Sequence, residues 1–301
     1  MVSPFVTASV WNYCNQHCSY CLAKSQDWNF KGRFEVFRPE GCEGLNDFEI
    51  RERCGVNYYK KMCDDDALLN AADVMDVEYL AAWLATWRKD AVVHITGGEP
   101  LLRPDIESFV EKIATTHKVV LYTNGSLINR RKKLLDIPIF WHVTYHKEQI
   151  TLARFTEIIA AIKDKPHRVS SVLRRSDRAD LDGLKKNFKG YDFEPVLADR
   201  PKRVSGRPAA VDLKSPASKL FNLITPCGTV WPCNACSEPV GSIYTNTFDE
   251  KKAQVYDKMA RRCLRRGLCF GFKTQIHIEN LAKKWGFFDS RRKRLPRSTS
   301  G

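Results

Sequence analysis

The sequence predicts an α/β protein, an open partial (β/α)6 barrel followed by a small cysteine-containing C-terminal extension. Six apolar, β-branched segments alternate with helical segments up to residue 197, and this alternation is typical of a parallel sheet. Six repeats are too few for the usual closed barrel of eight strands, so an open barrel is expected. Residues 199–216 are rich in Arg, Pro, Ser and Gly, which indicates a linker before the extension.

The elements are expected in strict alternation. Strands are expected at residues 5–11, 91–96, 119–123, 139–145, 169–173 and 193–197. Helices are expected at residues 66–88, 104–116, 130–135, 151–163 and 179–188, where apolar side chains recur at helical spacing. The chain therefore divides into four parts. These are a barrel at 1–198 with an irregular insertion at 26–66, a linker at 199–216, an extension at 217–289 and a basic tail at 290–301.

Composition limits the location and the redox chemistry. No run of 18 apolar residues occurs in the 301-residue chain, and the first 11 residues lack the basic start and long apolar core of a signal peptide. We therefore expect no membrane partner and a cytoplasmic location. The 11 cysteines are an odd number, and without a signal peptide they favour metal or redox chemistry over disulfides.

The net charge of +14 is concentrated near the C-terminus. Residues 1–250 carry 34 basic and 32 acidic side chains, whereas residues 251–301 carry 15 basic and 3 acidic ones. The run from Arg291 to Arg294 is the densest part of this excess. Such asymmetry favours a polyanionic partner, a nucleotide or a nucleic acid; the alternative is a solvated, disordered end.

Three cysteines, Cys14, Cys18 and Cys21, follow the first expected strand. Thiolates are soft ligands that suit iron–sulfur clusters, and three of them leave the fourth iron of a four-iron cluster open to a cofactor. A structural zinc site is the alternative, but zinc usually takes four ligands and commonly pairs them as C-x2-C. The spacing of three and then two residues therefore favours the cluster.

This C-x3-C-x-aromatic-C motif, with Tyr20 in the aromatic position, resembles the signature of the radical S-adenosylmethionine (SAM) superfamily. The resemblance implies that the three cysteines are catalytic and bind a [4Fe–4S] cluster whose open iron binds SAM. It further implies reductive cleavage of SAM to a 5′-deoxyadenosyl radical, which abstracts hydrogen from a substrate. A one-electron donor, a reductase or a protein of flavodoxin or ferredoxin type, is the implied partner.

A second motif, Gly97-Gly98-Glu99-Pro100, closes the second expected strand. Glycines at this place let the backbone approach a ligand closely. In the superfamily this motif holds the methionine ammonium of SAM, so Glu99 is the expected charged partner.

Polar residues end the next three expected strands. Asn124 is expected to reach the cofactor or substrate, with a simple turn as the alternative. Thr144 and His146 occupy positions where relatives place polar residues that face the cofactor ribose, with a structural role as the alternative for His146. Ser171 (or Ser170) is expected near the cofactor on the fifth strand, with ordinary packing as the alternative. The superfamily's glycine-rich adenine motif is absent from this strand, which leaves the adenine contacts unassigned.

The extension resembles the SPASM or twitch domains of radical SAM enzymes, through Gly228, Val230, Pro232 and Cys233 of a hairpin. Ser242 replaces the usual Asn of the later turn, and residues 213–226 contain no cysteine. One auxiliary iron–sulfur cluster is therefore the expectation, and a structural zinc or free thiols are the alternatives. Its ligands would come from Cys227, Cys233, Cys236, Cys263 and Cys269.

Three further cysteines, Cys42, Cys54 and Cys63, have irregular spacing and are interpreted as free thiols of the insertion.

Three functional hypotheses remain. The first is an enzyme that modifies a nucleotide or a nucleic-acid base, which the basic C-terminal part favours. The second is a peptide- or protein-modifying radical maturase, which the resemblance of the extension favours. The third is a non-catalytic iron–sulfur binding protein, which the intact motifs disfavour.

Overall fold

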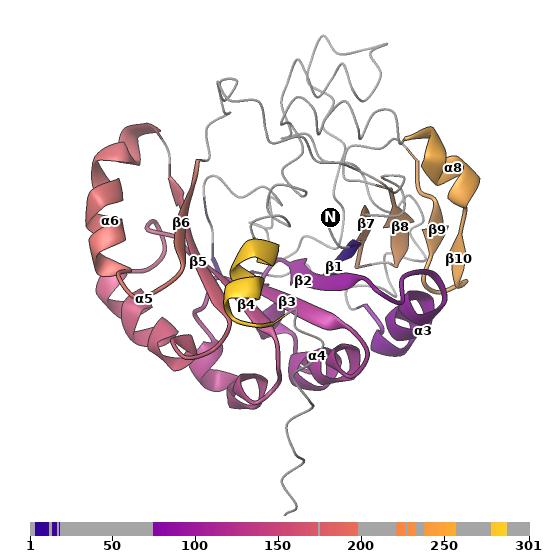
Figure 1. Ribbon diagram of the computed structural model, residues 1–301, viewed down its shortest axis with the longest axis horizontal. Helices are drawn as coiled ribbons and strands as arrows, with labels where there is room; N and C mark the ends of the chain where they lie inside the picture. The colour runs from indigo at the N-terminus through magenta and orange to yellow at the C-terminus, as the bar shows by residue number, and fades with distance from the viewer. Residues whose placement is uncertain are drawn as a thin grey trace, which may run out of the picture.

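The computed structural model describes residues 4–11, 14–16, 18, 75–173, 175–197, 221–226, 228–232, 238–256 and 278–287. Its centre is one curved sheet with helices along the convex face (Figure 1). The strand order is β10-β9-β8-β7-β1-β2-β3-β4-β5-β6. The stretch from β7 through β1 to β6 is parallel throughout, while β8, β9 and β10 continue it antiparallel. The predicted partial α/β barrel is confirmed.

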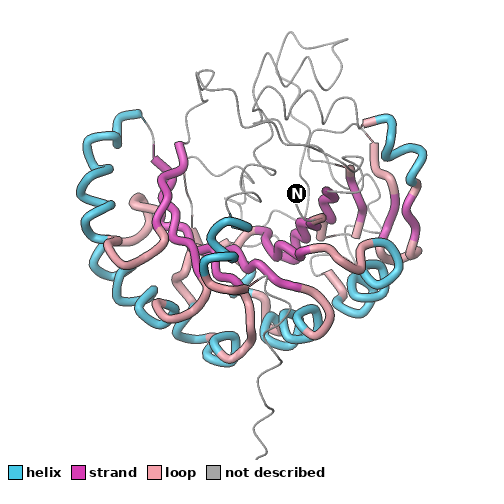
Figure 2. The backbone as a smooth tube through the Cα atoms, in the orientation of Figure 1, coloured by secondary structure: helices cyan, strands magenta, loops and turns pink. Residues whose placement is uncertain are grey.

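Strands of the barrel are β1 Phe5–Trp11, β2 Val92–Gly97, β3 Lys118–Thr123, β4 Phe140–Tyr145, β5 His167–Leu173 and β6 Phe193–Leu197. The α-helices between them are α3 Val77–Trp87, α4 Ile106–Ala114, α5 Leu152–Ile159 and α6 Leu181–Asn187. Short 3₁₀ helices are η1 Pro100–Leu102, η2 Ile128–Arg130, η3 Lys132–Leu135, η4 Ala160–Ile162 and η5 Arg175–Asp180. Figure 2 shows how the helices line the outer side of the strands.

Of the helix expected at 66–88, residues 66–74 lie outside the described residues; the structure shows α3 beginning at Val77, with Met75 and Asp76 outside it. The reason is Asp76, whose backbone is extended and whose Oδ1 accepts hydrogen bonds from the amides of Glu78 and Tyr79. The segment expected as a helix at 130–135 instead forms the 3₁₀ turns η2 and η3. Backbone hydrogen bonds in this segment join residues three apart, such as the amide of Leu134 to the carbonyl of Arg131, which is the 3₁₀ pattern.

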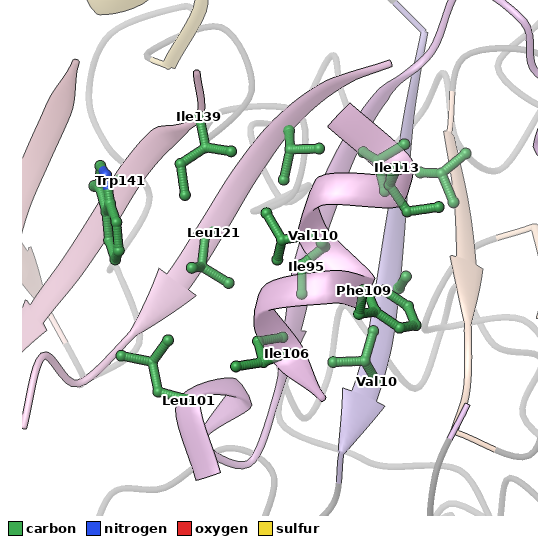
Figure 3. Close-up of a cluster of buried hydrophobic side chains, with 14 of the residues drawn as sticks. Val10, Ile95, Leu101, Ile106, Phe109, Val110, Ile113, Leu121, Ile139 and Trp141 are labelled. Carbon is green, nitrogen blue, oxygen red and sulfur yellow. The ribbon is translucent and has the colours of Figure 1, made fainter. Parts of the chain in front are cut away.

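The core lies between the sheet and the helices. One face of α4 buries Ile106, Phe109, Val110 and Ile113, which recur at the helical spacing, against alternate residues of the strands. Figure 3 shows these side chains packed against Val10, Ile95, Leu121 and Trp141. This layer fixes which residues of each strand face outward, and the intervening residues must therefore face the interior of the barrel.

The C-terminal segment continues the barrel sheet. Strand β7 Phe221–Ile224 lies parallel to β1, and β8 Thr229–Trp231, β9 Gly241–Ser242 and β10 Thr247–Phe248 extend the sheet beyond it. Helix α8 Glu250–Val255 follows β10. Trp83 Nε1 of α3 donates to the carbonyl of Thr247 at 3.0 Å, and Arg88 Nε donates to Asn222 Oδ1 at 2.6 Å. These bonds attach the added strands to the helix that packs on the barrel.

A helix at residues 278–284 closes one end of the barrel interior. Its Ile278 and Ala282 pack against Phe5, Phe140 and Phe221, which are the first residues of β1, β4 and β7. Figure 1 shows this helix in yellow on the concave side of the sheet. Further contacts come from Trp285, whose Nε1 donates to Asp192 Oδ2 at 2.8 Å. The interior is therefore closed by apolar side chains at the amino ends of the strands.

Replacement of Phe109 by Ala tests the core. Phe109 is fully buried, and the Arg103 guanidinium lies 4.2 Å from its ring centroid. We expect the Phe109→Ala variant to lose about 3–5 kcal/mol of unfolding free energy in urea, because it leaves a cavity in a close-packed layer. Val255→Ala, at a side chain that is 73% exposed, is the control and should change it by less than about 0.5 kcal/mol. Equal small losses in both variants would contradict this packing.

Candidate active site at the carboxyl ends of the strands

Cys14 and Cys18 lie in the loop that follows β1. Both are thiols; Cys18 is buried, and its Sγ donates to Gln16 Oε1 at 3.9 Å. Because β1 and β2 are parallel, with Trp11 opposite Gly97, this loop emerges at the same edge of the sheet as the Gly97-Gly98-Glu99-Pro100 motif. Tyr20 and Cys21, which complete the cysteine motif, lie outside the described residues.

The Gly97-Gly98-Glu99-Pro100 motif turns the chain from β2 into the 3₁₀ helix η1. Gly97 has a φ of 144°, a conformation that residues with a Cβ rarely adopt. Pro100 is buried at the first position of η1, where its missing N–H is no loss. The backbone turn thus requires glycine at position 97 and accommodates proline at position 100, independently of any ligand.

The Glu99 carboxylate connects this turn to the end of β3. Its Oε1 accepts from the amide of Leu101 at 3.0 Å and from Thr123 Oγ1 at 2.7 Å. Its Oε2 accepts from the amide of Asn124 at 2.7 Å, and the side chain is 0% exposed. Oε2 keeps acceptor capacity for one further donor, so a contact with the methionine ammonium of SAM stays a prediction.

Burial raises the pKa of Glu99 to about 7, and the hydrogen bonds from Asn124, Thr123 and Leu101 only partly oppose this shift. A buried carboxyl with so high a pKa is near its titration point at neutral pH. A cationic group placed against it would favour the carboxylate. Perturbed pKa values of this kind gather at functional sites.

Asn124 is buried, and its side chain turns toward the cysteine loop. Its Nδ2 donates to Asn15 Oδ1 at 2.9 Å and approaches Cys14 Sγ at 4.0 Å. The structure therefore brings Cys14, Glu99 and Asn124, three residues predicted from sequence, into one hydrogen-bonded group.

The ends of β4 and β5 contribute a second polar group. Thr144 Oγ1 lies 3.0 Å from Ser170 Oγ, and His142 Nε2 lies 3.2 Å from the same oxygen. Ser171 is fully buried and shares its strand face with Val169 and Leu173, which belong to the core beside the helices. Of the two serines, Ser170 thus accompanies Thr144 on the interior face. Burial lowers the pKa of His146, just beyond β4, to about 4, which leaves its imidazole neutral at pH 7.

A belt of interior polar side chains was missed by the sequence reasoning. Tyr122 Oη lies 3.1 Å from His94 Nδ1, and the Tyr122 and His142 ring centroids are 4.3 Å apart. Arg168 forms an ion pair with Glu194 on the same inward face. The available signal was the period of two along the strands, which puts these residues opposite the outward apolar ones.

Residues of the predicted auxiliary-cluster segment are described only in part. Gly228 lies in the turn between β7 and β8; it has a φ of 75°, and a Cβ there would lie 2.5 Å from the Tyr244 ring, so this tight turn requires glycine. Val230 of β8 pairs with Gly241 of β9. The predicted metal ligands and thiols of this segment and of the insertion lie outside the described residues: Cys227, Cys233, Cys236, Cys263, Cys269, Cys42, Cys54 and Cys63.

Residues 8–138 match the family model of the Radical SAM superfamily. This segment, which is less than half of the chain, resembles a radical SAM domain. The match begins within β1 and includes its cysteine loop, β2 with the Gly97-Gly98-Glu99-Pro100 motif, and β3 with Asn124. The radical SAM superfamily is a class whose cofactors are a [4Fe–4S] cluster and SAM and which requires a reductant.

Two curated relatives are GTP 3′,8-cyclases. The Aquifex aeolicus protein is 27% identical over 130 residues, covering 42% of this chain and 29% of the relative. The Haemophilus ducreyi protein is 25% identical over 185 residues, covering 60% of this chain and 42% of the relative. The chain therefore spans less than half the length of these relatives.

Among solved structures, Streptococcus suis SuiB bound to the precursor peptide SuiA superposes with a TM-score of 0.54 and 12% identity. The superposition covers 90% of this chain and 72% of that structure. At this identity the similarity concerns the fold alone, an α/β partial barrel. Within the described residues, no helix has the length and apolar character needed to cross a membrane.

The described residues fit both cofactors. Two thiols, Cys14 and Cys18, lie in the loop after β1, and thiolates are the ligands that iron–sulfur clusters use. Beside this loop lies a buried carboxyl, Glu99, with remaining acceptor capacity, next to a glycine turn that a ligand can approach closely. This donor set suits a thiolate-bound metal cluster and a ligand that carries an ammonium group.

Replacement of Glu99 by Gln tests the buried carboxyl through pH. As the pH rises from about 4.5 to 7, the carboxyl of the unfolded chain ionises first, whereas burial delays the ionisation of folded Glu99. The free energy of unfolding of the unmodified chain should therefore fall relative to that of Glu99→Gln over this pH range. At ~1.4 kcal/mol per pKa unit, the shift of the Glu99 pKa from 4.5 to about 7 corresponds to a fall of about 3 kcal/mol. Urea unfolding at a series of pH values measures it.

The control for this experiment is Glu157→Gln, which removes one exposed carboxyl from α5. A difference between unmodified chain and Glu99→Gln that stays constant from pH 4.5 to 7 would contradict the buried, proton-binding carboxyl.

Proposed function

We propose that this enzyme uses a [4Fe–4S] cluster on Cys14, Cys18 and Cys21 and bound SAM to abstract hydrogen from a nucleotide-class substrate. The observation that carries the proposal is the meeting of three strand ends at one edge of the sheet. Cys14 of the β1 loop, Glu99 after β2 and Asn124 after β3 are connected there by hydrogen bonds. The bound cofactors supply one-electron reductive chemistry that ends in hydrogen abstraction from the substrate.

The chain's own residues are proposed to bind and orient the two cofactors and to enclose the interior of the barrel. Cys14, Cys18 and Cys21 are proposed as the thiolate ligands, Glu99 as the partner of the methionine ammonium, and Gly97 and Gly98 as backbone that approaches the cofactor. Thr144 and His146 are proposed to face the cofactor from the end of β4. The apolar floor formed by the helix at 278–284 closes the opposite end of the interior and keeps water from entering there. Substrate would therefore enter at the carboxyl ends of the strands.

The nucleotide substrate class is supported by two observations. The curated relatives are named GTP 3′,8-cyclases, although they match this chain over less than half of their own length. Independently, residues 251–301 carry 15 basic and 3 acidic side chains, a charge that attracts phosphate groups.

One auxiliary cluster near the substrate is also proposed. Its ligands would come from Cys227, Cys233, Cys236, Cys263 and Cys269 of the C-terminal extension.

A peptide substrate is the second candidate. It is favoured by the similarity of fold to SuiB, whose structure is described as bound to a precursor peptide, over 90% of this chain. The two candidates differ in the chemistry that would recognise them: a nucleotide presents phosphates to basic side chains, whereas a peptide presents main-chain groups to a strand edge.

Single cysteine variants test the catalytic assignment. The anaerobically reconstituted chain, given dithionite and SAM, should form 5′-deoxyadenosine, measured by mass spectrometry. Cys14→Ala, Cys18→Ala and Cys21→Ala should each lower the yield at least about a hundredfold, because two thiolates do not hold the cluster. Cys42→Ala, in the insertion, is the matched control and should retain the yield. Equal yields from Cys14→Ala and Cys42→Ala would overturn the assignment.

Salt dependence tests the substrate class. Binding of GTP, followed by calorimetry, should weaken as KCl is raised, since salt screens the attraction between phosphate groups and basic side chains. Exchange of the four basic residues 291–294 for Gln should weaken binding and reduce this dependence on salt. Exchange of Lys185 and Lys186 of α6 for Gln is the control. Salt-independent binding, or none, would overturn the nucleotide proposal in favour of the peptide.

A further inference from the structure

Three side chains form a closed ring of hydrogen bonds between the cysteine loop and the turn after β3. Asn124 Nδ2 donates to Asn15 Oδ1 at 2.9 Å, and Asn15 Nδ2 donates to Ser126 Oγ at 2.9 Å. Ser126 Oγ in turn donates to Asn124 Oδ1 at 2.6 Å, which closes the ring. Asn15 lies between Cys14 and Cys18, so the ring holds the loop that carries the proposed cluster ligands.

The turn that carries Asn124 and Ser126 is itself fixed. The amide of Asn124 donates to the buried Glu99 carboxyl at 2.7 Å, and the amide of Gly125 donates to Thr123 Oγ1 at 3.0 Å. Gly125 has a φ of 81°, and a Cβ there would lie 2.9 Å from Val143 Cγ1, so the turn has little room to move. The ring of hydrogen bonds therefore restrains the cysteine loop against a turn that is itself held at the edge of the sheet.

The same Asn124 Nδ2 group also points at Cys14 Sγ, at 4.0 Å, the long end of the range for a donor to sulfur. Hydrogen bonds to ligating sulfurs stabilise the more negative, reduced state of an iron–sulfur cluster and so raise its reduction potential. A buried amide is a neutral donor that does this without adding charge to the site.

We propose that Asn124 is a positioning residue that fixes the cysteine loop through Asn15 and Ser126 and raises the reduction potential of the cluster through Cys14. The second half of this proposal rests on the cluster of the proposed function. The first half concerns the protein alone. Asn124 was expected from sequence to face cofactor or substrate, but its amide atoms are already used by Asn15, Ser126 and Cys14.

Three variants of the full chain separate the two roles: Asn124→Ala, Asn15→Ala and Ser126→Ala. Asn187→Ala, on the exposed side of α6, is the control. The first measurement is the rate at which iodoacetamide alkylates Cys14 in the cluster-free protein, followed by peptide mass spectrometry. All three ring variants should react several-fold faster than the unmodified chain and than Asn187→Ala. Rates equal to that of Asn187→Ala in all three would overturn the positioning role.

The second measurement is the midpoint potential of the reconstituted cluster, from a redox titration followed by electron paramagnetic resonance. Asn124→Ala should shift it to a more negative value than Asn15→Ala does, because Asn15→Ala keeps the Asn124 amide donor. Equal potentials for Asn124→Ala and the unmodified chain would overturn the tuning role. If Asn124→Ala does not fold, Asn124→Leu, which keeps a similar shape without a donor or a charge, replaces it.

These outcomes are distinct from failure of the proposed function. A chain that holds the cluster but forms no 5′-deoxyadenosine would contradict the function, while the midpoint potentials would still decide the role of Asn124. A chain that binds no cluster at all would contradict the function and the tuning role together, while the alkylation rates would still decide the positioning role.

Discussion

The buried carboxyl of Glu99 is the interaction on which the site depends. It accepts hydrogen bonds from the turn after β2 and from both the side chain and the main chain at the end of β3. Burial of a carboxylate is costly unless it is hydrogen-bonded, and here three donors offset part of that cost. Two strand ends are thereby held in one arrangement, and the turn after β3 can in turn hold the cysteine loop. Glu99 is thereby connected to the cysteine loop through Asn124.

The carboxyl edge of the sheet, where the site lies, rests on three groups of side chains in the rest of the barrel. Apolar side chains fill the space between sheet and helices, and a second apolar group closes the interior at the amino ends of the strands. Between the floor and the cysteine loop lies a polar belt that includes His94, Tyr122 and His142. Burial raises the pKa of Tyr122, so its hydroxyl remains a proton donor and acceptor at neutral pH. A polar interior above an apolar floor is the arrangement expected of a barrel that receives a ligand at one end only.

Local patterns predicted the barrel well because each element is set by its own residues. Strands β1 and β6 lie at the residues expected from apolar, β-branched runs, and α4 follows the helical spacing of Ile106, Phe109, Val110 and Ile113. The start of α3 was wrong, because Asp76 as N-cap outweighs the apolar spacing that continues upstream. The pairing of β7 with β1 was not predicted, since strand neighbours far apart in the sequence leave no local signal. The closing helix at 278–284 was missed for the same reason.

Within the site, residue types were predictable but their partners were not. Gly97 and Glu99 were identified from a motif, and the structure adds that Glu99 binds main-chain and side-chain donors at the end of β3. Asn124 was identified as a polar strand end, yet only the folded chain shows that its amide meets Asn15, 109 residues away. Ser171 and Ser170 could not be separated until the register of β5 showed which one faces inward.

The central claim is that the loop after β1 holds a cluster to which SAM binds directly. The most direct test is electron paramagnetic resonance of the reduced protein before and after SAM is added, with iron and sulfide counted per chain. The unmodified chain should show a cluster signal that SAM changes, and the variant with Cys14, Cys18 and Cys21 all replaced by Ala should show no SAM-responsive signal. A signal in the triple variant that SAM changes as it does in the unmodified chain would contradict the account.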